Sequence, residues 1–419
     1  MRDMKVLIVG SGGREDAIAY KVSQSPLLSE LYCIPGNGGM AQRGKILEGK
    51  VEDVPEIAKD LGIEFVIVGP EAPLVDGIVD RCREYNISIF GPDSRGAQLE
   101  GSKIFAKKFM KKNNIPTAEF YIPSDYNDAV RYIKENGLKA IKADGLAGGK
   151  GVVIPEDLDS ASSVIYRFMV ERVLGKSGEM IVLEDILVGR EISCIVITDG
   201  SNYCSLPIAQ DYKRAYDGNR GPNTGGMGSI APIYIGEEIR NKIKDRIIER
   251  TLEGLRREGI TYRGVIYFGL MLVDNDPYVL EYNVRLGDPE TQAIIPLLKD
   301  DILEIFYETV TSNLSLSKLN LKPCYTCCVV LVSGGYPGHY EVGKEITGLD
   351  DISECILFHA GTKLVDDRFY TAGGRVLNVV GSGETLEVAR EKAYGCVSRI
   401  NFENMYYRKD IGQGVSNID

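Results

Sequence analysis

Short apolar runs alternate with longer, helix-compatible stretches over the first hundred residues of this 419-residue chain. The runs at 4–9, 31–34, 65–68 and 87–90 have the length of single strands, and each leads into a turn that contains glycine. Strands that alternate with helices are typical of a parallel, doubly wound sheet, in which ligands bind at the carboxyl ends of the strands. We therefore predict an N-terminal α/β domain whose loops form a ligand site.

The first of these loops, GSGGRE at 10–15, joins a strand to a helical stretch from Asp16. Backbone N–H groups at such a helix start bind anions. The loop only partly matches a dinucleotide fingerprint, because the third glycine falls at Glu15 and no acidic residue ends the next strand. We interpret the loop as a phosphate or sugar-phosphate site with Arg14 as an added cation. A dinucleotide-dependent oxidoreductase is the competing interpretation, and the failed fingerprint argues against it.

The most informative stretch is KAIKADGLAGGKGVV at 139–153, which holds four glycines in seven residues between Lys142 and a Val-Val pair. A strand, a glycine-rich turn and a second strand predict a flexible hairpin. Glycine lets the backbone approach an anion closely, and Lys142 and Lys150 add positive charge. The spacing does not fit a Walker loop, and the other protein-kinase motifs are missing. We predict a polyphosphate-binding flap, with an ordinary glycine-rich hairpin as the alternative.

The flap is flanked by a predicted helix over 102–113 and by a small α/β lobe over 117–187. Lys103 lies in the first turn of that helix, where a cation opposes the helix dipole. We expect Lys103 to bind a ligand. The alternative is that it is a solvated lysine, as Lys107 and Lys111 are expected to be. The lobe closes with a strand over 180–183 and a short crossover, which is typical of an adenine-binding segment or of a hinge between lobes.

A second glycine-rich loop, GPNTGGMG at 221–228, follows the charged segment QDYKR. After a helix over 236–258, two strands are predicted, and the second carries Glu281, Asn283 and Arg285 at alternating positions. These side chains should share one face of the strand. A carboxylate and an amide oxygen suit a hard cation such as Mg²⁺, and Arg285 can hold a phosphoryl or carboxylate oxygen. A strand with a hydrated polar face is the alternative.

The pattern changes again near 323, where short strands and a helix over 384–400 predict a small α+β domain. The expected fold is therefore an α/β multidomain protein with an N-terminal doubly wound parallel sheet, a two-lobed core and a small C-terminal α+β domain. We expect domain limits of 1–101, 102–322 and 323–419, with the flap lobe at about 117–187.

Composition narrows the class of function. The net charge of −11 and the lack of a basic stripe argue against nucleic-acid binding. No apolar run approaches the roughly 20 residues of a membrane span, and the N-terminus leads directly into a strand, so we expect a cytoplasmic protein. Nine scattered cysteines predict reduced thiols, and the segment with Cys324, Cys327 and Cys328 is interpreted as a buried strand rather than a metal half-site. With only two histidines, positioning and electrostatics are favoured over histidine base catalysis.

Taken together, the motifs resemble ATP-grasp ligases, and most closely the phosphoribosylamine–glycine ligase (glycinamide ribonucleotide synthetase) family. The resembling stretches run in order along nearly the whole chain: VGSGGRE, GPEAPLVDGIVD, IKADGLAGGKGVV, QDYKR, GPNTGGMG, EYNVRLGDPETQ, SGGYPG and TAGGRVL. The chain departs from the family at Asp16 and Tyr212, where the family usually has His. A sister ATP-grasp enzyme, such as a carboxylase that uses bicarbonate, is the alternative, and the QDYKR and GPNTGGMG segments argue against it.

The resemblance implies ATP-dependent ligation of glycine to 5-phosphoribosylamine through glycyl phosphate, which gives glycinamide ribonucleotide, ADP and phosphate in the second step of purine biosynthesis. It implies ATP with Mg²⁺ or Mn²⁺, small-molecule substrates, no nucleic-acid or membrane partner, and a monomer or weak homodimer.

The same resemblance assigns the site residues. The ATP site would comprise Lys103, Lys142, Gly145, Gly148, Gly149, Lys150, Gly151, Glu184, Ile186 and Glu191. Glu281 and Asn283 would bind the metal. The substrate site would comprise Gly12, Gly13, Arg14, Glu71, Asp211, Lys213, Asn223, Thr224, Arg285 and Asp288. Catalytic roles would fall to Arg285, Lys142 and Asp211. Glu71, Asp211 or solvent would take the proton of the attacking amine.

Overall fold

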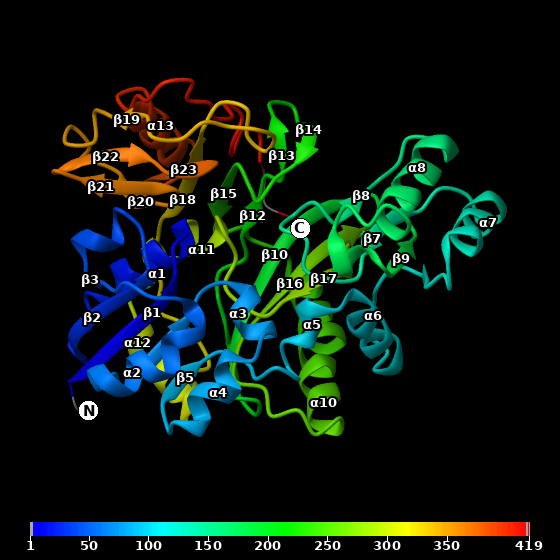
Figure 1. Ribbon diagram of the computed structural model, residues 1–419, viewed down its shortest axis with the longest axis horizontal. Helices are drawn as coiled ribbons and strands as arrows, with labels where there is room; N and C mark the ends of the chain where they lie inside the picture. Colours follow the sequence, from blue (N-terminus) through cyan, green and yellow to red (C-terminus); the bar gives the residue numbers. More distant parts are fainter. Residues whose placement is uncertain (1–2, 416–417, 419) are drawn as a thin grey trace.

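The computed structural model describes residues 3–415 and 418. Its N-terminal part is a five-stranded parallel sheet in the order β3-β2-β1-β4-β5, with the flanking helices seen at the lower left of Figure 1. The strands are β1 (Met4–Gly10), β2 (Leu28–Pro35), β3 (Lys45–Ile46), β4 (Phe65–Val68) and β5 (Ser88–Phe90), and the helices are α1 (Gly13–Val22), α2 (Val54–Leu61), α3 (Glu71–Val75) and α4 (Ile78–Glu84). The predicted doubly wound sheet is confirmed.

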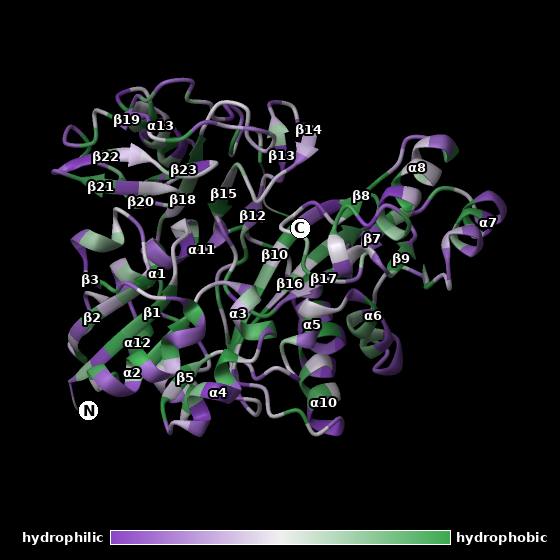
Figure 2. Cartoon of the chain, viewed as in Figure 1, coloured by the Kyte–Doolittle hydropathy of each residue, from purple (hydrophilic) through white to green (hydrophobic). Residues whose placement is uncertain are grey.

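The middle of the chain forms two lobes, each with its own antiparallel sheet. The larger has the order β11-β10-β16-β17, from Tyr203–Ser205, Arg190–Thr198, Gly264–Val273 and Asp276–Asn283. Helices α5 (Gln98–Gly101), α6 (Lys103–Lys112), α9 (Glu237–Ile243) and α10 (Glu249–Arg257) accompany it, and a π turn over Lys244–Ile248 joins the last two. The central strand β16 is the most apolar of the four (Figure 2), and eight of its ten residues are buried.

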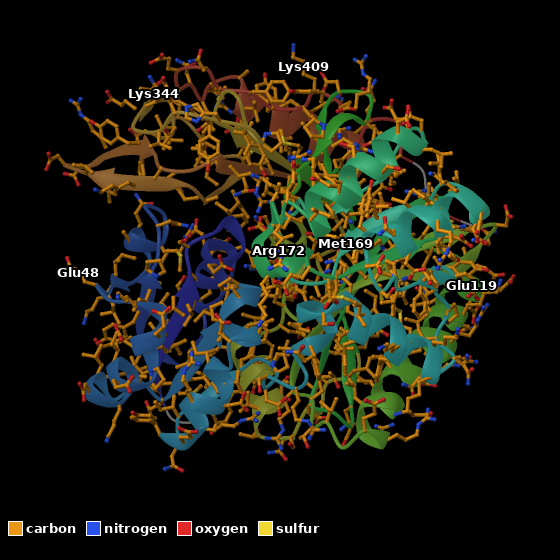
Figure 3. All side chains as sticks on the ribbon, turned by 45° about the vertical axis from the view of Figure 1, so that its right-hand side comes forward. Glu48, Glu119, Met169, Arg172, Lys344 and Lys409 are labelled. Carbon is orange, nitrogen blue, oxygen red and sulfur yellow. A yellow bond between two sulfur atoms is a disulfide. The ribbon has the colours of Figure 1, made fainter. Side chains whose placement is uncertain are left out.

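The smaller lobe carries the flap and projects to the right in Figure 1. Its sheet has the order β6-β9-β7-β8, from Phe120–Tyr121, Ile181–Glu184, Ala140–Ala143 and Val152–Val153, and it packs against α7 (Tyr126–Asn136) and α8 (Leu158–Met169). The lobe has a separate small core that includes Ile141, Ile165 and Leu183. Figure 3, in which this side comes forward, shows Met169 and Arg172 in front at the end of α8. A lobe with its own core can move as a unit.

The C-terminal part shares its main sheet with earlier residues. The order is β12-β15-β18-β23-β20, from Gln210–Asp211, Gly228–Ala231, Tyr325–Val332, Arg375–Gly383 and Ile356–His359. A second sheet, β19-β22-β21, comes from Glu345–Ile346, Arg368–Thr371 and Thr362–Val365, and α13 covers Leu386–Val397. Because β12 and β15 precede residue 323, the C-terminal sheet itself holds Asp211 and the second glycine-rich loop in place. The hairpin β13 (Arg214–Tyr216) and β14 (Arg220–Asn223) lies between these two strands in the chain.

The prediction that all cysteines are reduced is wrong at one pair, because Cys355 and Cys396 form a disulfide. Residue 355 immediately precedes β20, and residue 396 lies in the last turn of α13. They are 41 residues apart in sequence, and their Cα atoms lie 6.7 Å apart. Only the packing of α13 on the sheet brings them together. The segment with Cys327 and Cys328 was predicted to be a buried strand. This prediction is confirmed, since both cysteines are fully buried in β18.

Asp16, one of the two departures from the family, joins the N-terminal domain to the C-terminal sheet. Its buried carboxylate pairs with Nε of Arg43 at 2.7 Å and accepts the backbone N–H of His359 at 2.7 Å. It also lies outside the lining of the large cavity described below. An acceptor at this position therefore ties α1 to the end of β20.

The buried His359 makes folding stability depend on pH. Burial lowers the pKa of His359 to about 4, against the opposing effect of the Asp16 charge. Between pH 4 and 6.5 the unfolded chain therefore binds a proton that the folded chain does not, so stability falls as the pH drops through this window, by up to about 3 kcal/mol. We expect His359→Asn to flatten this part of the dependence. The urea denaturation midpoints of the wild type and the variant are measured at pH 4.5 and at pH 7. An equal change in midpoint between the two pH values for both proteins would contradict the assignment.

Candidate active site

One large cavity, with a volume of about 1530 Å³, lies where the N-terminal sheet, both middle lobes and the C-terminal sheet meet. It gathers most of the residues that the sequence singled out. Those that line it are Arg14, Glu71, Lys103, Lys142, Gly148, Gly149, Gly151, Glu184, Ile186, Glu191, Asp211, Lys213, Asn223, Thr224, Glu281, Asn283, Arg285 and Asp288.

Four candidates do not line the cavity, namely Gly12, Gly13, Gly145 and Lys150. Gly13 is buried against the side chains of Asn378 and Gln292, which leave no room for a Cβ. Lys150 is exposed at the tip of the flap. The N-terminal loop therefore presents Arg14, rather than its glycines, to the cavity.

The flap is a two-stranded hairpin in which Ile141 pairs with Val153 and Lys142 with Val152. At its turn, Gly148 and Gly149 have φ angles of +55° and +78°. L-residues with side chains rarely adopt this left-handed conformation. Asp144, directly after β7, anchors the base of the flap by accepting the hydroxyl of Ser102 and the N–H of Ile104 at the start of α6. The flap thus has a fixed base and a turn that only glycine adopts readily.

Stiffening the flap turn should lower turnover. Proline fixes φ near −65°, so Gly148→Pro opposes the observed +55° and should reduce kcat by about 10-fold or more if flap closure protects the reaction. Gly137→Pro is the matched control, because Gly137 lies in the same lobe with φ of +78° but outside the cavity. Steady-state rates of both variants measure the effect. Equal rates for the two would show that the flap neither limits nor guards the reaction.

Two lysines converge on one buried carboxylate at the back of the cavity. Nζ of Lys107 and Nζ of Lys142 lie 2.8 and 2.9 Å from Oε2 of Glu184. Lys107 is only 2% exposed, so its use as an example of a solvated lysine was wrong. Its position four residues after Lys103, on the same face of α6, is the sequence signal that was missed. Burial lowers the pKa of Lys107 to about 8, although Glu184 opposes the shift.

The crossover after β9 forms the next part of the wall. Residues Asp185 to Gly189 connect β9 to β10 along the cavity, and Ile186 is partly exposed there. Glu191 lies at the start of β10 and forms an ion pair with Lys213. Backbone groups, an apolar side chain and a carboxylate along one crossover can accommodate a heterocyclic base with an attached sugar.

Glu281 and Asn283 present oxygen atoms to the cavity from the end of β17. Burial opposes ionisation of Glu281, but the charges of Lys213, Lys103 and Lys142 lower its pKa, so the carboxylate is ionised. Nδ2 of Asn283 is buried and has no hydrogen-bond partner among the described residues, while its Oδ1 accepts from Arg285 at 3.0 Å. An ionised carboxylate and an amide oxygen fit a hard divalent cation that takes its other ligands from phosphate and water. The described residues contain no cluster of three acidic, histidine or cysteine ligands that could hold a metal ion.

Arg285 is the centre of an ion-pair network rather than a free cation. Its guanidinium lies 3.2 Å from Glu71 in α3 and 3.1 Å from Glu100 in α5. Glu100 was not predicted as a site residue. Burial raises its pKa to about 7, although the charge of Arg285 lowers it. No local motif marks Glu100, because its partner lies 185 residues away in sequence.

The C-terminal sheet supplies a further cation that the sequence interpretation did not assign. Arg375, in the TAGGRVL motif, lies 3.2 Å from Asp288 and donates to the carbonyl of Gly225 at 2.7 Å. The hydroxyl of Tyr336 accepts the Gly225 N–H at 3.1 Å. The second glycine-rich loop is therefore fixed by side chains from residues after 323.

Tyr212, the second departure from the family, lies on the wall beside these groups. The guanidinium of Arg408 stands 5.1 Å from the centre of its ring, and its hydroxyl accepts the N–H of Gly412 at 2.9 Å. The aromatic ring thus packs the C-terminal segment against the cavity wall.

Comparison with known families identifies the chain. The three domain models of phosphoribosylglycinamide synthetase match in order: the N domain over residues 4–100, the ATP-grasp (A) domain over 101–291 and the C domain over 326–414. This chain belongs to the phosphoribosylglycinamide synthetase family. It is therefore a ligase with the ATP-grasp fold.

Full-length relatives agree with the family assignment. A phosphoribosylamine–glycine ligase of Caldanaerobacter subterraneus subsp. tengcongensis is 46% identical over 98% of this chain and 100% of its own length. The crystal structure of phosphoribosylamine–glycine ligase from Thermotoga maritima superposes with a TM-score of 0.88 at 38% identity, covering 97% of this chain and 100% of that one. The trifunctional purine biosynthetic protein adenosine-3 of Homo sapiens is 42% identical over 97% of this chain, which matches 42% of that protein.

More distant structures share the fold alone. The biotin carboxylase domain of a 2-oxoglutarate carboxylase from Hydrogenobacter thermophilus has a TM-score of 0.73 at 18% identity, covering 97% of this chain and 92% of that one. In addition, none of the helices within 3–415 is long and apolar enough to cross a membrane.

Proposed function

We propose that this ligase joins glycine to 5-phosphoribosylamine through glycyl phosphate, releasing glycinamide ribonucleotide, ADP and phosphate in the second step of purine biosynthesis. The observation that carries the proposal is one cavity that brings together a glycine-rich flap, the oxygen pair of Glu281 and Asn283, and Arg285. Family membership, and relatives of this name that match over their full length, support it.

The chemistry runs in two displacements. A carboxylate oxygen of glycine attacks the γ-phosphorus of ATP, the bond from that phosphorus to the ADP oxygen breaks, and glycyl phosphate forms. The nitrogen of phosphoribosylamine then attacks the acyl carbon, the carbon–oxygen bond to phosphate breaks, and the attacking nitrogen loses a proton. Both steps move negative charge onto phosphate oxygens, so fixed positive charge is what the site must supply.

The nucleotide occupies the half of the cavity under the flap. Lys103, Lys142 and the flap N–H groups hold its phosphates, and the crossover with Ile186 and Glu191 holds adenine and ribose. Mg²⁺ or Mn²⁺ held by Glu281 and Asn283 neutralises phosphate oxygens when bound. Flap closure excludes water, which would otherwise hydrolyse the acyl phosphate.

The phosphoribosylamine half lies toward the N-terminal loop and the second glycine-rich loop. Arg14, Lys213, Asn223 and Thr224 provide its polar wall. Arg285 faces the junction of the two halves and stabilises the transferring phosphoryl group. Asp211 accepts the proton of the attacking amine, because burial raises its pKa well above the ordinary carboxyl value, although Lys213 opposes the shift.

We further assign the enzyme to the cytoplasm, as a monomer or weak homodimer that acts on small molecules alone. The acidic chain and the lack of a membrane-spanning helix within residues 3–415 support this assignment.

The decisive assay is release of ADP from ATP and Mg²⁺ with glycine and freshly generated phosphoribosylamine, omitting each in turn. Release that requires both substrates is the expected result. Release of ADP with neither substrate, or with another acid in place of glycine, would contradict the proposal and indicate a different ATP-grasp reaction.

A further inference from the structure

The carboxylates that line the cavity differ in how their charge is compensated. Most have a cation within 4 Å among the described residues: Glu71 and Glu100 pair with Arg285, Asp288 with Arg375, Glu184 with two lysines, Asp185 with Lys139, Glu191 and Glu281 with Lys213, and Asp410 with Arg408. Asp217 makes no such pair, but it accepts a backbone N–H at the partly exposed hairpin. Asp211 and Glu290 remain, and neither forms an ion pair within the described part of the chain.

Glu290 is the more deeply buried of these two, at 3% exposure. Its Oε1 accepts the hydroxyl of Tyr267 at 2.9 Å and that of Ser193 at 3.2 Å. Its Oε2 receives no hydrogen bond from any described residue, and the residue lines the cavity. The charges of Arg285 and Arg375 act on Glu290 only from beyond ion-pair distance. A buried carboxylate without a cation in direct contact is costly, so its position on the cavity wall points to a cationic ligand.

The backbone is adapted to this carboxylate. A Cβ at Gly287 would lie 2.4 Å from Oε2 of Glu290 if nothing shifted. Tyr267 and Ser193 come from the neighbouring strands β16 and β10, whose pairing is continuous at this point. Two strands and a side-chain-free loop position therefore fix Glu290 in one orientation.

We propose that Glu290 recognises the ammonium group of glycine, a role that rests on the function proposed above. The glycine zwitterion has a negative and a positive end. Arg285 presents positive charge for the carboxylate that attacks ATP, and Glu290, five residues further along the chain, presents negative charge for the ammonium. Asp211 on β12 extends the negative side of the cavity toward the second substrate.

This arrangement also directs the chemistry. An ammonium held by a carboxylate stays protonated, and a protonated nitrogen has no electron pair with which to attack an acyl carbon. The glycyl group held at Glu290 is therefore only the electrophile of the second step, and phosphoribosylamine supplies the attacking nitrogen. The same contact selects an amino acid over a hydroxy acid of equal size, because glycolate leaves the carboxylate unpaired.

The test is Glu290→Gln, assayed with glycine and glycolate as the acid. Loss of a hydrogen bond to a charged group should raise KM for glycine about 10- to 100-fold, while KM for ATP changes little. Preference for glycine over glycolate, as the ratio of kcat/KM values, should fall by a similar factor. A purely structural role would not change this ratio.

Two further variants make the result interpretable. Tyr267→Phe removes one donor to Glu290 and should raise KM for glycine a few-fold, so it serves as the test if Glu290→Gln does not fold. Asp199→Asn is the matched control, because Asp199 is a 5% exposed carboxylate outside the cavity that accepts the N–H groups of Ser201 and Asn202; its KM for glycine should stay unchanged.

An unchanged KM and preference in a folded Glu290→Gln variant would overturn the inference while the ligase activity stands. A wild-type enzyme that ignores glycine would instead overturn the proposed function.

Discussion

Arg285→Ala is expected to lower the ligation rate about 100- to 1000-fold, the loss typical of removing a donor that stabilises developing charge. The guanidinium lies where the two halves of the cavity meet, and its planar donors match phosphate and carboxylate oxygens. ATP binding should change by less than about 3-fold, because charge from Lys103, Lys142 and the flap remains. Turnover and an independent ATP titration measure the two quantities. A loss of nucleotide affinity equal to the loss of activity would contradict this role.

Arg285→Lys is the informative companion. A single ammonium keeps the charge but cannot reproduce the fork that contacts Glu71 at 3.2 Å and Glu100 at 3.1 Å. We expect a ligation rate between those of the wild type and Arg285→Ala. The ammonium still neutralises the charge of the two carboxylates, but it lacks the forked donor geometry of the guanidinium. Arg285→Ala should fold, since Glu100, whose pKa is already raised to about 7 by burial, becomes neutral when the cation is removed. Arg285→Lys should fold because it keeps a cation beside the two carboxylates.

Glu281→Gln is expected to reduce turnover by about 100-fold or more, and to raise the Mg²⁺ concentration needed for half-maximal rate. Glu281 is the acidic member of the oxygen pair, and the surrounding lysines keep it ionised. The amide variant retains shape and oxygen but loses the charge. Rates over a range of Mg²⁺ and Mn²⁺ concentrations measure the effect. Glu191→Gln is the control, because it removes the other carboxylate that pairs with Lys213. An unchanged metal requirement in Glu281→Gln, or an equal change in both variants, would refute the metal role.

Much of the fold was predictable because its signals are local. The glycines of residues 145–151 indicated a hairpin, and two of them adopt positive φ at its turn. Alternation of Glu281, Asn283 and Arg285 indicated one shared face, and all three line the cavity. Apolar runs of strand length predicted four of the five strands of the N-terminal sheet, and only the two-residue β3 was missed. In each case the residues that determine the structure are neighbours in sequence.

The unpredicted features all depend on partners distant in sequence. Lys107 is buried because β9 brings Glu184 to it, and Glu100 matters because Arg285, two residues after the end of β17, pairs with it. Glu290 appears within a motif, yet its hydroxyl donors come from β10 and β16. The Cys355–Cys396 disulfide requires α13 to pack on the sheet. Apart from the four-residue spacing of Lys103 and Lys107, a single sequence contains no local pattern that indicates these long-range pairs.

The most direct test of the account follows oxygen. Glycine labelled with ¹⁸O at both carboxylate positions should transfer one labelled atom to each inorganic phosphate released, since the carboxylate oxygen that attacks ATP leaves with the phosphate when the amide forms. The carbonyl of the product should keep the other label. Unlabelled phosphate, or label in AMP, would contradict activation through glycyl phosphate.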